Sequence, residues 1–354
     1  MDAPPHVPAA SPTEPRRLQT EPIPACPACA GPGQIALSDC VDYMCGLPGR
    51  WSFRECDQCH SLWLDPRPTD ASIPDCYPAN YTCTRLDFPV DMAATTSIVA
   101  SAKLSLLAKK FGYASLRSRA RSPLGNFFGR LLTVVPAAVS KAGHSVRFLH
   151  SRPEGRLLDI GCGNGAFLSL MQKLGWEVEG IEPDLLAAEV ARSRGIQVHV
   201  ANAENAPIAI NSFDAITLTH VAEHFASPGV ILERLSSWLR PGGALVSVSP
   251  NPRGVIRRLF GNKWYQLDPP RHLFLPSRDG YRALLEPLGF EIEIWTSMRM
   301  APWALNESMS IARKGAVHGG RPSPALKLFA LLLSVFSLAV PNLGEEIISY
   351  ARKR

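Results

Sequence analysis

Four cysteines in two closely spaced pairs are the first residues of this sequence whose types and spacing could do chemistry. Both pairs read CxxC, 26 residues separate them, and the four residues are Cys26, Cys29, Cys56 and Cys59. Four thiolates can close a tetrahedral shell around zinc, and a shell filled by protein ligands makes a structural rather than a catalytic site. We therefore predict structural Zn²⁺ in residues 25–85, with Cys40 and Cys45 as the main competing ligands.

A glycine-rich segment, LLDIGCGNGAF at 157–167, could bind a nucleotide. Its glycines are Gly161, Gly163 and Gly165. Glycine lets the backbone approach a ligand closely and turn sharply into a helix. Glu182 follows Gly161 by 21 residues, where a carboxylate can accept hydrogen bonds from both hydroxyls of a ribose. Asp159 would repel the pyrophosphate of a dinucleotide, so it favours a ligand with a cationic end, such as S-adenosylmethionine.

Apolar and amphipathic segments alternate around these residues from about position 155. We expect strands over Arg156–Gly161, Glu177–Glu182, Gln197–Val200, Phe213–His220, Ala244–Ser249 and Phe290–Thr296. We expect helices over Ala166–Leu174, Asp184–Arg194, Pro228–Leu239 and about Ser277–Leu288. Strands alternating with helices predict an α/β fold with a parallel, doubly wound sheet. Ligands bind such sheets at the carboxyl ends of the strands, which is where the glycine loop leaves the first strand.

These motifs resemble those of class I S-adenosylmethionine-dependent methyltransferases. The sequence is similar to that family in LLDIGCGNGAF, VEGIEPD, NAENAPIAINSFDAITLTHVAEH and WLRPGGALVSVSPN, in the family's order over about 155–297. The resemblance implies a Rossmann-like fold. It also implies that Asp159 and the three glycines line the methionine side of the cofactor, that Glu182 holds the ribose, and that Ala203 and Glu204 flank the adenine.

The resemblance extends to both sides of this core. CPAC…CDQCHSLWLDPRPT…CYPANY resembles the zinc-ribbon segment that precedes the methyltransferase domain in a subgroup linked to sugar and polysaccharide biosynthesis. The terminal EEIISYARKR resembles the last strand of the fold, inserted antiparallel. The resemblance implies a core at 151–300, an apolar helical insertion at 301–344 and the last strand of the core at 345–354.

Histidines that follow the later strands are candidates for the chemistry. Methyl transfer from a sulfonium requires alignment and an acceptor that has lost its proton. His224 in THVAEH is our first candidate for the base, unless it is a helix-capping residue; His220, in the same segment, joins the catalytic and the cofactor-binding candidates. Alternatively, His220, Glu223 and His224 could bind a divalent metal. In the loop DPPRH, His272 and Arg271 could bind an anionic or hydroxylated acceptor, unless the loop is simply stiffened by proline.

Charge and hydrophobicity divide the rest of the chain. Residues 1–24 are rich in proline and predict a disordered tail. Positions 93–153 contain ten Lys and Arg and no Asp or Glu. We expect a basic helical connector at 86–150 that attracts phosphates or an anionic membrane face, or else a solvated linker. The apolar segment 325–340 is short of the roughly 20 residues of a spanning helix, which favours a buried or interfacial helix.

Together these observations predict a cytoplasmic methyltransferase, with peripheral membrane contact as an option. The expected acceptor is a hydroxyl or carbon of a small molecule, a sugar or glycan precursor. Two alternatives stay open: an RNA methyltransferase, and a non-catalytic binding protein that kept the cofactor fold. The cysteine module has one basic and aromatic cluster, at 50–54, so nucleic acid is disfavoured. The sequence does not specify the acceptor, the methylated atom or the oligomeric state.

Overall fold

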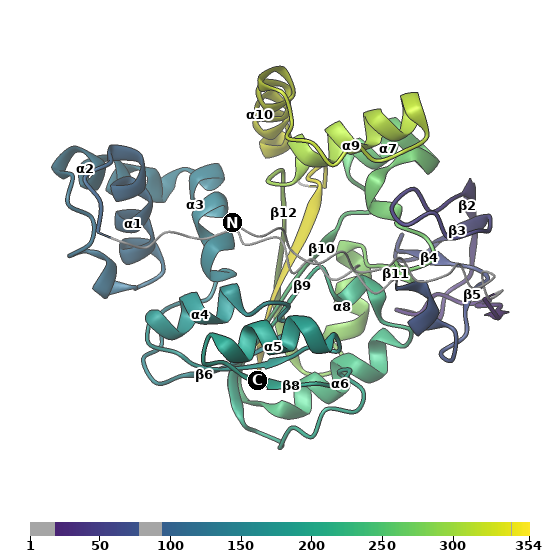
Figure 1. Cartoon of the computed structure of the whole chain (residues 1–354), viewed down its shortest axis with the longest axis horizontal. Helices are drawn as coiled ribbons and strands as arrows, with labels where there is room; N and C mark the ends of the chain where they lie inside the picture. The colour runs from purple at the N-terminus through teal and green to yellow at the C-terminus, as the bar shows by residue number, and fades with distance from the viewer. Residues whose placement is uncertain (1–17, 78–93, 341) are drawn as a thin grey trace, which may run out of the picture.

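A seven-stranded sheet forms the centre of the molecule (Figure 1), a computed structural model that describes residues 18–77, 94–340 and 342–354, except the side chains of 334–339. The strand order is β12-β13-β10-β9-β6-β7-β8. The bounds are β6 (Arg156–Ile160), β7 (Glu177–Ile181), β8 (Gln197–His199), β9 (Phe213–Thr219), β10 (Leu239–Pro250), β12 (Phe290–Ser297) and β13 (Glu346–Lys353). Within this sheet β13 runs antiparallel to both neighbours, and the other pairs are parallel.

The strand order reverses beside β6. From β6 the chain adds β7 and β8 on one side, then returns to place β9 and β10 on the other. Such a reversal leaves a crevice at the carboxyl ends of the central strands. β10 is longer than expected because Leu239 pairs with Phe213 across a shift in register.

Helices cover the sheet and position the loops that leave it. They are α4 (Ala166–Lys173), α5 (Leu185–Ser193), α6 (Pro228–Trp238) and α8 (Arg278–Leu285), whereas α7 (Val255–Phe260) lies beside a later helix, α9 (Ala301–Lys314) (Figure 1). α5 begins where the Asp184 side chain accepts hydrogen bonds from the N–H groups of Leu186 and Ala187. This cap satisfies N–H groups that the helix itself leaves unpaired, and it fixes the exit of the chain from β7.

Two further groups of helices flank the sheet (Figure 1). The connector forms α1 (Ile98–Lys110), α2 (Pro123–Leu131) and α3 (Pro136–Gly143) on one side. Between β12 and β13 the chain forms α9 (Ala301–Lys314) and α10 (Pro324–Ala339). In the described part of the chain, no helix is long and apolar enough to cross a bilayer.

The cysteine-bearing segment forms a small sheet, and a short strand from much later in the chain completes it. β2 (Gly33–Cys40), β3 (Trp51–Cys56) and β4 (Leu62–Leu64) pair antiparallel, and β11 (Phe274–Leu275) joins the free edge of β4. The buried Trp63 and three of the cysteines belong to the same hydrophobic core as Tyr281 of α8. The segment is therefore fused to the sheet domain rather than tethered to it.

The prediction of a disordered tail at 1–24 is wrong for its last seven residues. β1 (Thr20–Glu21) pairs with β5 (Arg67–Pro68), and the Ile23 carbonyl accepts a hydrogen bond from Trp63 Nε1 at 2.8 Å. These long-range contacts order a proline-rich stretch whose composition alone suggests disorder. Residues 1–17 and Cys83 lie outside the described residues.

A buried arginine joins the cysteine-bearing sheet to the loop before β11. Arg271 is 1% exposed. Its Nη1 lies 3.0 Å from Asp42 Oδ2, its Nε lies 3.0 Å from Asp268 Oδ2, and Nη1 also donates to the Cys76 carbonyl. Asp42 and Asp268 are themselves buried. Because the guanidinium is fully buried, these contacts must replace its hydration.

We expect Arg271→Leu to lower the free energy of unfolding by about 3–5 kcal/mol, because it leaves two buried carboxylates without a cation. Urea denaturation measures this loss. The control is Arg282→Leu, since the ion pair of Arg282 with Asp279 is about half exposed and is worth less than about 1 kcal/mol. Equal losses in both variants would contradict the role given to Arg271.

Candidate active site

The glycine loop turns back on the second strand of the sheet. Gly161 has φ +66°, and a Cβ there would lie 2.6 Å from Val221 Cγ2. Gly163 has φ +54°, and its N–H donates to Glu182 Oε2 at 2.8 Å. Both positions need glycine because side chains rarely tolerate this backbone, and at Gly161 a side chain would also clash. The loop therefore exposes its backbone to the space beside Glu182.

Glu182 is held by backbone groups at the end of β7. Its second oxygen accepts from the Asp184 N–H at 3.0 Å. Burial raises the pKa of Glu182, while the N–H groups of Asp184 and Gly163 oppose the rise. The carboxylate is thus oriented by two donors, and its remaining lone pairs are available to a ligand.

A cavity of about 2470 Å³ opens at the carboxyl ends of β6, β7 and β9. Most of the residues predicted for the cofactor line it, namely Gly161, Gly163, Glu182, Ala203, Glu204 and His220. Gly165 and Asp159 do not. Gly165 instead packs against α5, where a Cβ would lie 2.8 Å from that of Ala191.

Asp159 is not a free acidic floor, which corrects the expectation from the sequence. It is fully buried, and its Oδ1 accepts hydrogen bonds from Arg147 Nη1 and from Thr217 Oγ1. Burial raises the pKa of Asp159, and Arg147 and Thr217 act against this rise. The guanidinium of Arg147 also lies 3.8 Å from the centre of the Phe167 ring. The sequence reasoning missed Arg147 as a site residue because the connector showed only an excess of positive charge.

Two predicted histidines, His224 and His272, lie together in the same cavity. Their ring centroids are 4.8 Å apart, and the rings meet edge to face. His224 Nδ1 lies 3.1 Å from the Arg271 carbonyl, and His272 Nδ1 lies 2.7 Å from the Gln266 carbonyl. A carbonyl can only accept, so each ring carries a proton on Nδ1. Tyr77 OH also approaches His224 Nδ1, at 3.0 Å.

The histidine that completes a possible metal group is His272 and not His220. Glu223, His224 and His272 each offer a ligand atom, and these atoms lie within 4.8 Å of one another. The group expected from the sequence, His220, Glu223 and His224, consisted of residues that are close along the chain. His272 comes from a loop after β10, and spacing alone did not pair it with His224.

His220 is held as a cation. Its Nδ1 lies 3.3 Å from Glu223 Oε1, and its Nε2 lies 3.3 Å from Glu346 Oε1 of β13. Partial burial would lower the pKa of His220, but the two carboxylates outweigh it and raise the pKa to about 10. A base must be neutral at working pH. The structure therefore argues against a role as base for His220, which the sequence placed among the catalytic candidates.

Arg271 is likewise unavailable to an acceptor. Its guanidinium is buried between Asp42 and Asp268, outside the residues that line the cavity. The sequence showed only that Arg271 and His272 share a loop. It did not show that Asp42 and the Cys76 carbonyl, from the cysteine-bearing segment, accept the hydrogen bonds of Arg271.

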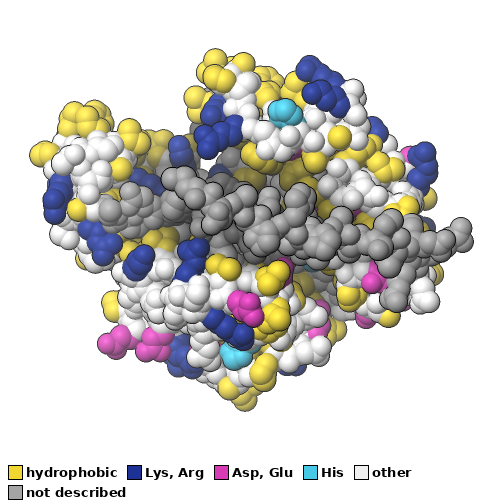
Figure 2. All heavy atoms as spheres, in the orientation of Figure 1, with side chains coloured by type: hydrophobic (Ala, Val, Ile, Leu, Met, Phe, Trp, Pro, Cys, Tyr) yellow, Lys and Arg dark blue, Asp and Glu magenta, His cyan; other side chains and the backbone are white. Residues whose placement is uncertain are grey.

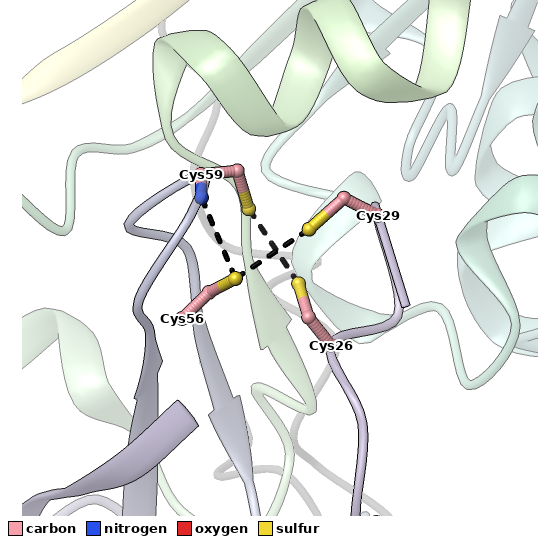
Figure 3. Close-up of side chains that lie close together, drawn as sticks. All are labelled: Cys26, Cys29, Cys56 and Cys59. Atoms are coloured by element: carbon pink, nitrogen blue, oxygen red, sulfur yellow. Dashed lines mark hydrogen bonds between the residues drawn. The ribbon is translucent and has the colours of Figure 1, made fainter. Parts of the chain in front are cut away.

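The four predicted cysteines point toward one another (Figure 3). The Sγ atoms of Cys26 and Cys59 are 3.5 Å apart, and those of Cys29 and Cys56 are 3.4 Å apart. Zinc–sulfur bonds of about 2.3 Å would require tetrahedron edges of about 3.8 Å, so the cluster fits this ion with a small expansion. Cys40 and Cys45 are not part of the group.

The family comparison matches the part of the chain that carries this site. Residues 137–293 match the model of a methyltransferase domain. This part of the chain is therefore similar to a methyltransferase domain. The match begins in α3 and ends in β12, so it includes the glycine loop, Glu182 and the three histidines.

Curated relatives share part of this methyltransferase domain. The ubiquinone biosynthesis O-methyltransferase of Nitrobacter winogradskyi is 30% identical over 147 residues, which cover 38% of this chain and 56% of the relative. The protein of the same name from Cereibacter sphaeroides is 33% identical over 117 residues, which cover 31% of this chain and 47% of that protein. The chain thus spans about half the length of the curated relatives it matches. Both names refer to O-methyl transfer in ubiquinone biosynthesis, and neither name refers to sugars.

Solved structures similar to the chain include a possible histamine N-methyltransferase from Thermotoga maritima and the YcgJ protein from Bacillus subtilis. The first has a TM-score of 0.43 and 20% identity, and it covers 65% of this chain and 95% of its own. The second has a TM-score of 0.41 and 20% identity, and it covers 60% of this chain and 97% of its own.

We expect His220→Asn to lower the free energy of unfolding by more than about 2 kcal/mol at pH 6, because the buried Glu223 loses its cation and the buried Glu346 keeps only Arg299, at 3.9 Å. The folded pKa of His220 lies above the ordinary value of 6.5. Its contribution is therefore complete below pH 6.5 and declines as the pH rises toward 10. Urea denaturation of both proteins at pH 6 and pH 10 should show the difference shrinking. His318→Asn, at an exposed histidine, should change little at either pH; a gap for His220→Asn that is constant with pH would refute the argument.

Proposed function

We propose that this protein transfers a methyl group from S-adenosylmethionine to a hydroxyl or carbon of a small acceptor. The observation that carries the proposal is the carboxylate of Glu182, oriented by Gly163 beside the glycine loop in a methyltransferase domain. Ala203 and Glu204 line the same cavity and suit the adenine side. The cofactor supplies an electrophilic methyl group on a sulfonium when bound.

His224 is the residue best placed to take the acceptor's proton. Burial, with His272 as the second cause, lowers the pKa of His224 to about 4, so the ring is neutral near pH 7. The Arg271 carbonyl holds its Nδ1–H, which leaves the Nε2 lone pair for the acceptor. His272 lies against it and would help to orient the acceptor. Glu223, His224 and His272 also suit a divalent metal, which would polarise the acceptor oxygen.

Two classes of acceptor fit these requirements. A sugar or glycan precursor follows from the resemblance of the cysteine-bearing segment. A phenolic hydroxyl, as in a quinone precursor, is favoured by the names of the relatives from N. winogradskyi and C. sphaeroides. Release of S-adenosylhomocysteine in the presence of each class would distinguish them.

We also propose that the four cysteines hold a structural zinc ion. Their Sγ geometry supports it, and β11 ties the cysteine-bearing sheet to the loop of His272.

Peripheral contact with a membrane is a further part of the proposal. It is supported by Leu328, Leu331 and Leu332 of α10, each about 60% exposed.

We expect Glu182→Gln to weaken the binding of S-adenosylmethionine at least 10-fold in isothermal titration calorimetry, because an amide cannot accept both ribose hydroxyls while holding its two backbone donors. Glu189→Gln is the matched control, since Glu189 is exposed on α5. Wild-type protein that is folded and fails to bind the cofactor would overturn the proposed function.

We expect purified protein to hold about one zinc per chain, and Cys56→Ser to lose it. Since a structural zinc ion contributes several kcal/mol to folding, the variant's Tm should fall by about 5–15 °C. Elemental analysis and thermal unfolding measure the two effects. Cys45→Ser, at an exposed cysteine outside the cluster, should retain both the zinc and the Tm. Loss of zinc from Cys45→Ser would show that the ligand set is wrong.

A further inference from the structure

The basic connector forms one wall of the cavity that contains Glu182 and the histidines. Lys103 of α1, Lys141 of α3 and Arg299, two residues before α9, all line this cavity. Arg119 and Arg147 of the connector line it as well. Several of the positive charges that the sequence concentrates in the connector thus line the site.

Lys103 and Lys141 have no counter-charge in the described part of the chain. No ion pair involves either residue there, whereas Arg147 is paired with Asp159 and Arg299 lies 3.9 Å from Glu346. Burial lowers the pKa of Lys103, and the charges of Lys141 and Arg299 lower it further. Lys103 therefore experiences the positive charge of both Lys141 and Arg299, and an anion bound beside it would relieve that repulsion.

The carboxylates of the cavity come from other segments. They are Asp70, Glu182, Asp184, Glu204 and Asp268, and none belongs to the connector, which has no Asp or Glu between 93 and 153. Figure 2 shows the same asymmetry on the visible surface over α1 and α2, where Lys and Arg appear together with hydrophobic side chains and without Asp or Glu. The connector's part of the cavity wall is thus purely basic, whereas the rest of the wall carries all of its carboxylates together with Lys173, Arg194 and Arg299.

The cavity is also larger than one small ligand needs. Pockets for single small ligands measure roughly 300–1,000 Å³, and this cavity measures about 2470 Å³. It has room for the cofactor and for a second, large molecule beside the connector.

We propose that Lys103, Lys141 and Arg299 form a subsite for a phosphate or diphosphate group on the acceptor. The inference rests on the proposed function and narrows its substrate class to phosphorylated acceptors. The anchored phosphoryl group would hold the reacting hydroxyl or carbon beside His224 and His272. A phosphoryl group of this kind occurs both on soluble sugar phosphates and diphosphates and on the headgroups of lipids.

The test is calorimetric titration of the full, zinc-replete chain with inorganic pyrophosphate at low salt, with S-adenosylhomocysteine bound. We expect saturable 1:1 binding that weakens at least 10-fold in Lys103→Gln and in Lys141→Gln. Lys109→Gln is the matched control, because Lys109 is exposed on the same helix as Lys103 and does not line the cavity. It should change the affinity less than 2-fold.

Each contrary outcome has a separate meaning. Equal weakening by Lys109→Gln, or binding that does not saturate, would show a general charge effect and overturn the subsite. Loss of S-adenosylhomocysteine binding in Lys103→Gln would show that Lys103 belongs to the cofactor site, and this result would also overturn the phosphate subsite. Wild-type protein that binds pyrophosphate but no S-adenosylhomocysteine would instead refute the proposed function.

Competition then separates the two sources of the phosphoryl group. Displacement of pyrophosphate by UDP-glucose, and not by vesicles of phosphatidylglycerol, would support a soluble acceptor. The reverse result would support a lipid headgroup, which fits the exposed leucines of α10. If neither competes, the subsite does not accept a phosphoryl group on a larger molecule, and the proposal fails.

Discussion

The guanidinium of Arg271 lies where water cannot reach it, between the carboxylates of Asp42 and Asp268. One carboxylate belongs to the cysteine-bearing segment and the other to the loop before β11. Neither segment can move away without leaving a charge buried and unpaired, which costs several kcal/mol. The interaction therefore fixes the distance between two parts of the chain that are more than 220 residues apart.

The candidate catalytic groups depend on that constraint. The Arg271 carbonyl accepts the Nδ1–H of His224, and the Leu273 N–H donates to the Glu223 carbonyl at 2.8 Å. β11 follows directly and extends the sheet of the four-cysteine segment. A metal bound by the four cysteines would thus help to set the tautomer and direction of a base, because β11 is paired with β4 of the cysteine-bearing sheet.

Charge is distributed unevenly around the cavity. On the side of the sheet, buried charges are balanced in pairs: Asp159 with Arg147, and His220 between Glu223 and Glu346. On the side of the connector, Lys103 and Lys141 are not balanced by any described carboxylate. Balanced pairs stabilise the fold, whereas unbalanced cations in a cavity attract a ligand of opposite charge.

Much of this molecule was determined by local sequence. The spacing of the glycines, the strand that ends at Glu182 and the two CxxC pairs predicted a sheet-edge nucleotide site and a four-cysteine cluster. Such features can be predicted from the sequence because backbone conformation, burial and thiol spacing depend on neighbouring residues. The tertiary structure alone decided that His272 joins His224, that Arg271 is buried, that His220 is a cation, and that the connector's lysines enter the cavity. Each of these depends on charges and hydrogen-bonding groups that are far apart along the chain, and their strength depends on how completely the fold removes water from between them.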